Sequence, residues 1–265
     1  MATIGLALGE PQGTECARAR VVNDFSISVA TVNGSGSQSA NNVLLKSIFG
    51  MGVPVSGKNL FPSNIAGLPT WFLIRASKDG YVARKPDSEI LVALNPETAK
   101  ADVEALPAGG VAIFEESLNL DQVRADVAFY PVPFDKITAS ICPEAKLRKL
   151  VKNMVYVGVV AQLLAIDLGV VESGLRRQFA KKQKVFDLNF GAVKAGFDYA
   201  QENLTALHDH AAHSLRPPAD FDGALHDVPG LPGGVRRPHE PPLPRAAQRL
   251  LAVWPAALAC GCCRR

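Results

Sequence analysis

The chain has 265 residues, of which 48% are hydrophobic, and its formal net charge is +3 at pH 7. That length and apolar content allow one or two domains with a buried core. A charge so close to zero gives no electrostatic reason to expect nucleic acid or an anionic membrane as partner. No apolar run is long enough to cross a bilayer, and the N-terminus lacks the basic segment of a secretory signal, so the expected location is the cytoplasm.

The first half of the chain reads as strands alternating with helices. We interpret residues 1–21 as a flexible leader and 25–32, where apolar and small polar residues alternate, as the first strand. A turn with two glycines follows, and 38–49 has helical spacing. Further strands are predicted near 53–55 and at 71–76, 90–94, 111–114 and 127–132, with a loop over 56–69 and a helix over 97–106.

Beyond residue 143 the pattern becomes helical, with helices predicted at 144–150, 155–168, 172–179 and 186–203. Strands that alternate with helices indicate an α/β fold, with a Rossmann-like, mostly parallel sheet flanked by helices. We therefore predict one such domain over 22–207.

The composition changes at residue 208. Residues 208–265 hold all five histidines, nine of the 19 prolines and three of the five cysteines, and they contain no Lys, Ile, Asn, Met, Tyr or Thr. An ordinary Pro-rich linker keeps Lys, Thr and Asn for solvation. Ala, Gly, Pro and Arg, which GC-rich codons encode, dominate instead. We interpret this segment as a disordered, low-order tail read out of frame from GC-rich DNA; the alternative is a genuine disordered tail.

The strand, glycine turn and helix over 25–49 have the form of a phosphate-binding turn. Backbone N–H groups at such a helix start favour an anion. The full dinucleotide fingerprint GxGxxG needs a third glycine, however, and the sequence has Ser39 there. NAD binding is therefore disfavoured, and a tight turn without a ligand stays open as an alternative.

Two longer motifs carry a resemblance to a known family. They are Val32-Asn33-Gly34-Ser35-Gly36-Ser37-Gln38-Ser39-Ala40-Asn41-Asn42 and the stretch from Gly52 to Phe72, which reads GVPVSGKNLFPSNIAGLPTWF. Together they resemble the N-terminal gamma domain of the alpha subunit of 2-oxoacid:ferredoxin oxidoreductases, above all the 2-oxoglutarate type. The segments 154–168 and 189–196 are similar to the close of that domain. The likeness covers residues 22–207.

This resemblance implies part of an enzyme that decarboxylates a 2-oxoacid on thiamine diphosphate, reduces ferredoxin and releases an acyl-CoA. It implies thiamine diphosphate, magnesium and iron–sulfur clusters in the complete complex, a thiamine-binding beta subunit as partner, and ferredoxin indirectly. The YPITP-like motif of the domain that normally follows is absent, and the tail stands in its place. We thus expect a truncated subunit that is inactive alone, that serves subunit assembly, and that binds no metal.

In this family the gamma domain is associated with access to coenzyme A. The resemblance transfers that role, as a candidate, to two segments, with Lys58 as a point charge for a phosphate; the competing interpretation of Lys58 is a solvated loop lysine. The candidate positions are Gly34, Ser35, Gly36, Ser37, Gln38, Ser56, Lys58 and Asn59.

Other candidate groups have ordinary explanations. Glu115 and Glu116 follow a predicted strand, but adjacent strand residues point to opposite faces, so we expect solvation and not a shared acid–base site. The basic stretch over 176–184 could face an acidic partner, although most such runs form a solvated helix face. No histidine lies in the predicted domain, which excludes a Cys–His nucleophile there.

Two other function classes stay open from sequence alone. One is a stand-alone nucleotide- or CoA-binding module without catalysis. The other, weaker because of Ser39, is a Rossmann-like dehydrogenase.

Overall fold

The computed structural model describes residues 21–62, 65–180, 182–204 and 213–217. Its centre is a six-stranded sheet with the order β3-β4-β2-β5-β6-β7. The pairs β2–β5, β5–β6 and β6–β7 are parallel, and only β4 runs against the others. The predicted mostly parallel α/β fold is confirmed. The strands of this sheet are β2 (Asp24–Val32), β3 (Val55–Leu60), β4 (Pro69–Ser77), β5 (Ile90–Ala93), β6 (Val111–Glu115) and β7 (Ala128–Val132).

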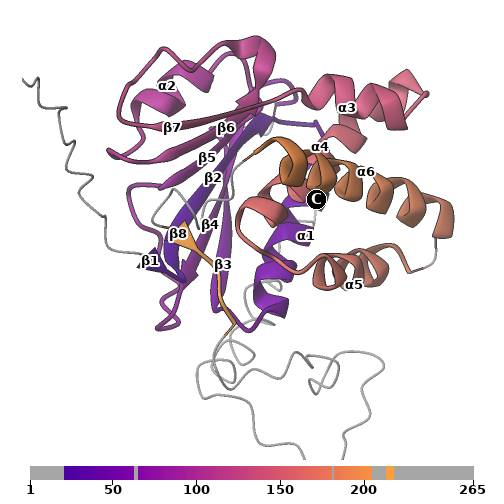
Figure 1. Ribbon diagram of the computed structural model, residues 1–265, viewed down its shortest axis with the longest axis horizontal. Coiled ribbons are helices and arrows are strands. Elements are labelled where there is room, and N and C mark those ends of the chain that lie inside the picture. Colours follow the sequence, from indigo (N-terminus) through magenta and orange to yellow (C-terminus); the bar gives the residue numbers. More distant parts are fainter. Residues whose placement is uncertain (1–20, 63–64, 181, 205–212, 218–265) are drawn as a thin grey trace, which may run out of the picture.

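Helices cover the two faces of the sheet unequally (Figure 1). One face packs against α1, α4 and, further out, α5 and α6, and this side contains the larger apolar core. The other face carries α2 and a smaller apolar cluster. The helices are α1 (Ser37–Gly50), α2 (Ala99–Glu104), a short 3-10 turn (Glu116–Leu118), α3 (Phe134–Ile141), α4 (Ala145–Leu163), α5 (Leu168–Phe179) and α6 (Gln183–Asn203).

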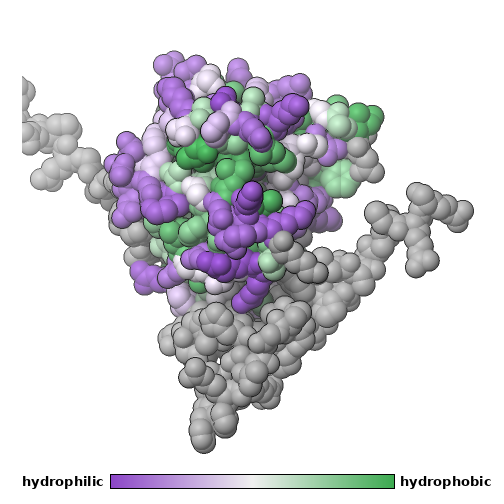
Figure 2. All heavy atoms as spheres, turned by 90° about the vertical axis from the view of Figure 1, so that its right-hand side faces the viewer, coloured by the Kyte–Doolittle hydropathy of each residue, from purple (hydrophilic) through white to green (hydrophobic). Residues whose placement is uncertain are grey.

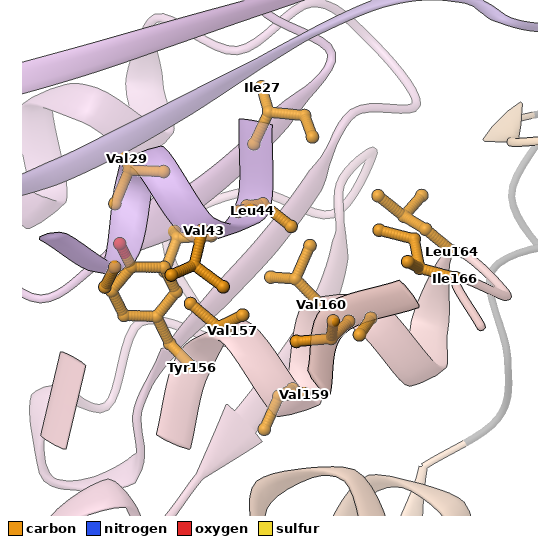
Figure 3. Close-up of a cluster of buried hydrophobic side chains, with 14 of the residues drawn as sticks. Ile27, Val29, Val43, Leu44, Tyr156, Val157, Val159, Val160, Leu164 and Ile166 are labelled. Atoms are coloured by element: carbon orange, nitrogen blue, oxygen red, sulfur yellow. The ribbon is translucent and has the colours of Figure 1, made fainter. Parts of the chain in front are cut away.

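Helix α4 is the centre of the larger core. Val157 and Val160 point with Val43 and Leu44 of α1 into one cluster beneath the sheet (Figure 3). Tyr156 is fully buried there, and its hydroxyl donates a hydrogen bond to Oδ1 of the buried Asn41. Such a bond ties the two helices together, because a buried polar group is stabilised only when it has a partner.

Helices α4 and α6 approach each other through glycines. A Cβ on Gly158 would lie 1.9 Å from the carbonyl oxygen of Val193, and one on Gly196 would lie 2.1 Å from that of Val155. Both contacts are with backbone, so no side-chain rotation relieves them. The two helices can therefore touch only because these positions have no side chain.

Three predicted elements are wrong in detail. Residues 55–60, expected mostly as loop, form β3, because pairing with β4 overrides weak strand propensity. The glycine at 57 is needed there, since an added Cβ would meet the Phe72 ring at 2.7 Å. The helices expected at 144–150 and 155–168 are one helix, α4, and α3 was not expected.

The segment after α6 returns to the start of the domain. Strand β8 (His213–Ser214) pairs in parallel with β1 (Val21–Val22), as the side-by-side ribbons in Figure 1 show. The Asn23 carboxamide donates to the Arg216 carbonyl at 2.7 Å and accepts from the Arg216 N–H at 2.9 Å, and Leu215 is buried in the larger core. The boundary at 207 and the out-of-frame tail stay predictions, and most of 208–265 lies outside the described residues, as does 1–20 of the predicted leader.

The face of the sheet that carries α2 holds a half-buried carboxylate. Asp102 of α2 accepts a hydrogen bond from Nε1 of Trp71 at 2.9 Å, whereas its Oδ2 is buried without a hydrogen-bond partner. Burial raises the pKa of Asp102 above its usual range. The proton is therefore bound more tightly in the folded state, and this stabilisation, present below the usual pKa of 3.8, is lost as pH rises through the folded-state pKa.

Replacing Asp102 by asparagine is expected to raise the free energy of unfolding at pH 7 and to lose that advantage near pH 3. Asparagine is neutral and keeps an acceptor for Trp71. Urea denaturation at both pH values measures the effect. The exposed Asp121 offers a control, since Asp121→Asn should change stability by less than about 0.5 kcal/mol. A less stable Asp102→Asn variant at pH 7 would contradict this account.

Candidate functional site

The glycine turn lies at the carboxyl edge of β2, where ligands bind in open α/β sheets. Gly34 and Gly36 have φ values of 82° and 80°, in the left-handed region that glycine adopts without strain. A Cβ on Gly36 would also lie 2.2 Å from Cδ2 of Leu150 in α4. The turn thus needs glycine for its backbone conformation, and Leu150 packs directly over Gly36.

A groove of about 300 Å³ opens beside this turn. One wall is formed by Ser37, Gln38 and Asn41 of α1, and the opposite wall by Asn59 and Phe61, at and just beyond the end of β3. Asn59 Nδ2 donates to Gln38 Oε1 at 2.5 Å and so joins the two walls. All the lining residues are neutral, being Gly, Ser, Thr, Asn, Gln and Phe, so the groove lining supplies no acid, base or thiol.

The start of α1 faces this groove without a carboxylate. Its first turn contains no acidic residue, and the preceding Gly36 has no side chain that could cap it. The Ser37 hydroxyl is instead paired with that of Thr31 at 2.9 Å. The positive end of the helix dipole is therefore not neutralised by an acidic side chain of this turn.

Helix α4 packs against the turn. Asn153 is buried, and its Nδ2 donates to the carbonyl oxygens of Ser35, at 2.9 Å, and of Lys149, at 3.1 Å. Leu150, which follows Lys149 in the chain, packs over Gly36. The sequence motifs gave no hint of these contacts, because the two segments lie more than a hundred residues apart.

The predicted site residues do not all meet. Gly34, Gly36, Ser37, Gln38 and Asn59 line one groove, and Ser35 is buried between the glycines with its carbonyl oxygen bound by Asn153.

Ser56 and Lys58 face away from the groove. Successive strand residues point to opposite faces, and Asn59 shares the groove face with Phe72, to which it is paired. Lys58 is paired with Leu73 on the other face, and the Ser56 hydroxyl donates to the carbonyl oxygen of Val82 there at 3.0 Å. Lys58 therefore does not reach a ligand in the groove, and the solvated-lysine interpretation fits its exposed position.

Glu115 and Glu116 separate as expected, but Glu115 is buried and not solvated. Its Oε2 accepts the backbone N–H of Asp135 in the first turn of α3 at 3.1 Å and pairs with Lys152 at 3.3 Å. Burial raises the pKa of Glu115, while the charge of Lys152 acts in the opposite direction. Glu115 thus anchors α3 and α4 to the end of β6, and Glu116 pairs separately with Lys136.

The basic stretch after residue 175 is largely a helix face. Arg176 pairs with Glu172 at 2.8 Å and lies 4.5 Å from the Phe186 ring centroid, whereas Arg177, Lys182 and Lys184 are exposed. A hydrophilic border around an apolar area is visible on the side where α3, α5 and α6 lie (Figure 2).

The described residues contain no cluster of three or more His, Cys, Asp or Glu that could hold a metal. No described helix could span a membrane. Four of the five tail histidines, together with Cys260, Cys262 and Cys263, lie outside the described residues, whereas His213 belongs to β8.

Residues 26–199 match the family described as pyruvate ferredoxin/flavodoxin oxidoreductase. The match covers the six-stranded sheet from Ser26 of β2 onward and both walls of the groove. The chain belongs to this family.

Two relatives have the names expected from the resemblance. The alpha subunit of 2-oxoacid:ferredoxin oxidoreductase 2 from Aeropyrum pernix is 20% identical over 68% of this chain. The 2-oxoglutarate oxidoreductase subunit KorA from Mycobacterium tuberculosis is 28% identical over 44% of it. The chain spans only 34% and 20% of the lengths of these two relatives.

Solved structures share the fold. A 2-oxoglutarate:ferredoxin oxidoreductase from Magnetococcus marinus, with 2-oxoglutarate, coenzyme A and succinyl-CoA bound, has a TM-score of 0.62 at 23% identity, over 69% of this chain and 32% of that one. The pyruvate oxidoreductase subunit PORC from Thermotoga maritima (TM-score 0.53, 19% identity) covers 66% of this chain and 96% of its own. The gamma subunit of a keto/oxoacid ferredoxin oxidoreductase from Geobacter sulfurreducens has a TM-score of 0.55 at 16% identity. The match covers 67% of this chain and 99% of that one.

Proposed function

We propose that this chain supplies the gamma domain of a 2-oxoacid:ferredoxin oxidoreductase whose substrate is 2-oxoglutarate. The complete enzyme would release carbon dioxide from the 2-oxoacid, transfer the acyl group to the thiol of coenzyme A, and pass two electrons to ferredoxin. Membership of the family and the names of the relatives support the reaction class. The choice of 2-oxoglutarate over pyruvate rests on the resemblance and on two of the relatives.

The observation that carries this domain's own role is the groove beside the glycine turn. Its helix start, which has no acidic side chain, suits a phosphate group, and the half-exposed Phe61 ring suits an aromatic base. The same lining offers nothing for proton transfer. In this proposal the domain holds coenzyme A and contributes to assembly, while thiamine diphosphate, magnesium and the clusters belong to partner segments, chiefly a thiamine-binding beta subunit.

The isolated chain is expected to oxidise no 2-oxoacid. The purified protein would be assayed with 2-oxoglutarate, coenzyme A and a viologen dye as electron acceptor, with calorimetry for coenzyme A binding. Binding without turnover is the expected result. Turnover by the chain alone would refute the proposal that catalysis needs partner segments. Absence of coenzyme A binding up to about 1 mM would refute the proposal that this domain binds coenzyme A.

A stand-alone coenzyme A- or nucleotide-binding module is the second candidate. The observation behind it is that the Thermotoga PORC subunit and the Geobacter gamma subunit are separate chains of almost the same extent as this fold. The discriminating observation is a neighbouring gene for a thiamine-binding beta subunit and its co-purification with this chain. Sequencing the gene from codon 207 onward, with the intact mass of the product, decides whether 208–265 is the natural continuation.

A further inference from the structure

The position of Lys58 leaves the groove without the cation that a phosphate would need. The lining is neutral, and Lys58 lies on the other face of the sheet. Basic residues do gather, however, in the first two turns of α4, the helix that contacts the glycine turn through Asn153 and Leu150. They are Lys146, Arg148, Lys149 and Lys152, and the first turn of this helix contains no acidic residue. Cations there add to the positive end of the helix dipole.

Two of these four cations are engaged within the domain. The Arg148 guanidinium donates to the carbonyl oxygens of Cys142, at 2.9 Å, and Pro143, at 3.2 Å. Lys152 pairs with Glu115 at 3.3 Å and with Asp135 at 2.9 Å. Lys149, by contrast, is exposed and forms no ion pair with any residue in the described part of the chain.

Lys149 is also the basic residue tied most directly to the glycine turn. One carboxamide, that of Asn153, binds both the Lys149 carbonyl and the Ser35 carbonyl, so the two backbones lie on either side of a single side chain. Residues four apart lie on the same helix face, and helical side chains lean toward the N-terminus. Lys149 is therefore on the helix face of Asn153, next in the chain to Leu150, whose Cδ2 would lie 2.2 Å from a Cβ on Gly36.

We propose that Lys149 pairs with a phosphate group of coenzyme A held in the glycine-turn groove, and that it takes the role first assigned to Lys58. The inference rests on the proposed function, because it presumes that the groove binds this ligand. Lys149 would be a binding residue that selects phosphorylated ligands, and it would take no part in the chemical step.

The test compares two exposed lysines, Lys149 in α4 and Lys58 on the face of β3 that points away from the groove. Coenzyme A binding to the full chain would be measured by calorimetry for wild type, Lys149→Ala, Lys149→Arg and Lys58→Ala. Loss of one exposed ion pair weakens binding by roughly twofold to fivefold. We expect that loss for Lys149→Ala, recovery for Lys149→Arg, no change beyond twofold for Lys58→Ala, and a weaker salt dependence for Lys149→Ala.

The outcomes separate the two proposals. Binding that is unchanged by Lys149→Ala would overturn the assignment of Lys149 and leave the coenzyme A site standing. A loss for Lys58→Ala in place of Lys149→Ala would return the role to Lys58 and contradict the inference. No binding of coenzyme A to the wild type would overturn both. Thermal unfolding of each variant confirms that the fold is retained, since both side chains are exposed.

Discussion

Gly158→Ala is expected to destabilise the domain by about 3 kcal/mol, the upper range for overpacking a well-packed interior. The added methyl would lie 1.9 Å from the Val193 carbonyl oxygen and 2.8 Å from the Phe197 nitrogen. Relief requires α4 and α6 to move apart along their contact, which opens the core around Val157. Urea denaturation followed by circular dichroism measures the change.

Gly191→Ala in α6 provides the matched control. No atom lies within 4 Å of a Cβ built at this position. Alanine there should stabilise the helix by about 0.5–1 kcal/mol, because glycine loses more conformational freedom on folding. The same substitution is thus expected to lower stability at Gly158 and to raise it at Gly191, although both glycines belong to one helix pair. A Gly158→Ala variant as stable as wild type would show that the two helices are not in backbone contact.

Tyr156→Phe is expected to cost about 1–3 kcal/mol, the penalty for leaving a buried acceptor without its donor. The substitution removes only the hydroxyl oxygen, so the apolar packing in Figure 3 is retained. Oδ1 of Asn41, which is 2% exposed, would then lose the Tyr156 hydrogen bond. The same denaturation measurement applies, and the groove next to Asn41 is expected to widen.

The double variant Tyr156→Phe with Asn41→Leu separates the hydrogen bond from the packing. Removing both polar partners takes away the unsatisfied acceptor, so the double variant should recover part of the loss. If Tyr156→Phe costs less than about 0.5 kcal/mol, the hydrogen bond is not a significant link between α1 and α4.

The sequence patterns predicted the parts of the fold that are locally determined. Fully apolar runs such as 90–94 and 111–114 became central parallel strands, and the glycine turn appears between β2 and α1 as expected. These elements follow from periodicity and from the conformational needs of glycine, both of which a single sequence displays. The residues of the two long motifs predicted the family, and the family match confirmed this prediction.

What was missed depends on contacts between distant segments. Strand β3 has weak propensity and exists because β4 pairs with it, and that pairing also decides that Lys58 points away from the groove. The support of the glycine turn by Asn153 and Leu150 joins residues more than a hundred positions apart. No local pattern distinguishes Lys149 from its basic neighbours, whereas the contacts around it do.

The two hydrogen bonds between Asn23 and Arg216 bring the chain before β2 and the segment after α6 to one place. A unit whose ends are adjacent can be joined to another polypeptide, or separated from it, without changing its core. Related folds occur in both settings: as nearly entire chains in the Thermotoga and Geobacter proteins, and as about a third of longer chains in the Aeropyrum and Magnetococcus proteins. Adjacent ends offer a physical reason why such a fold can form nearly a whole chain or part of a longer one.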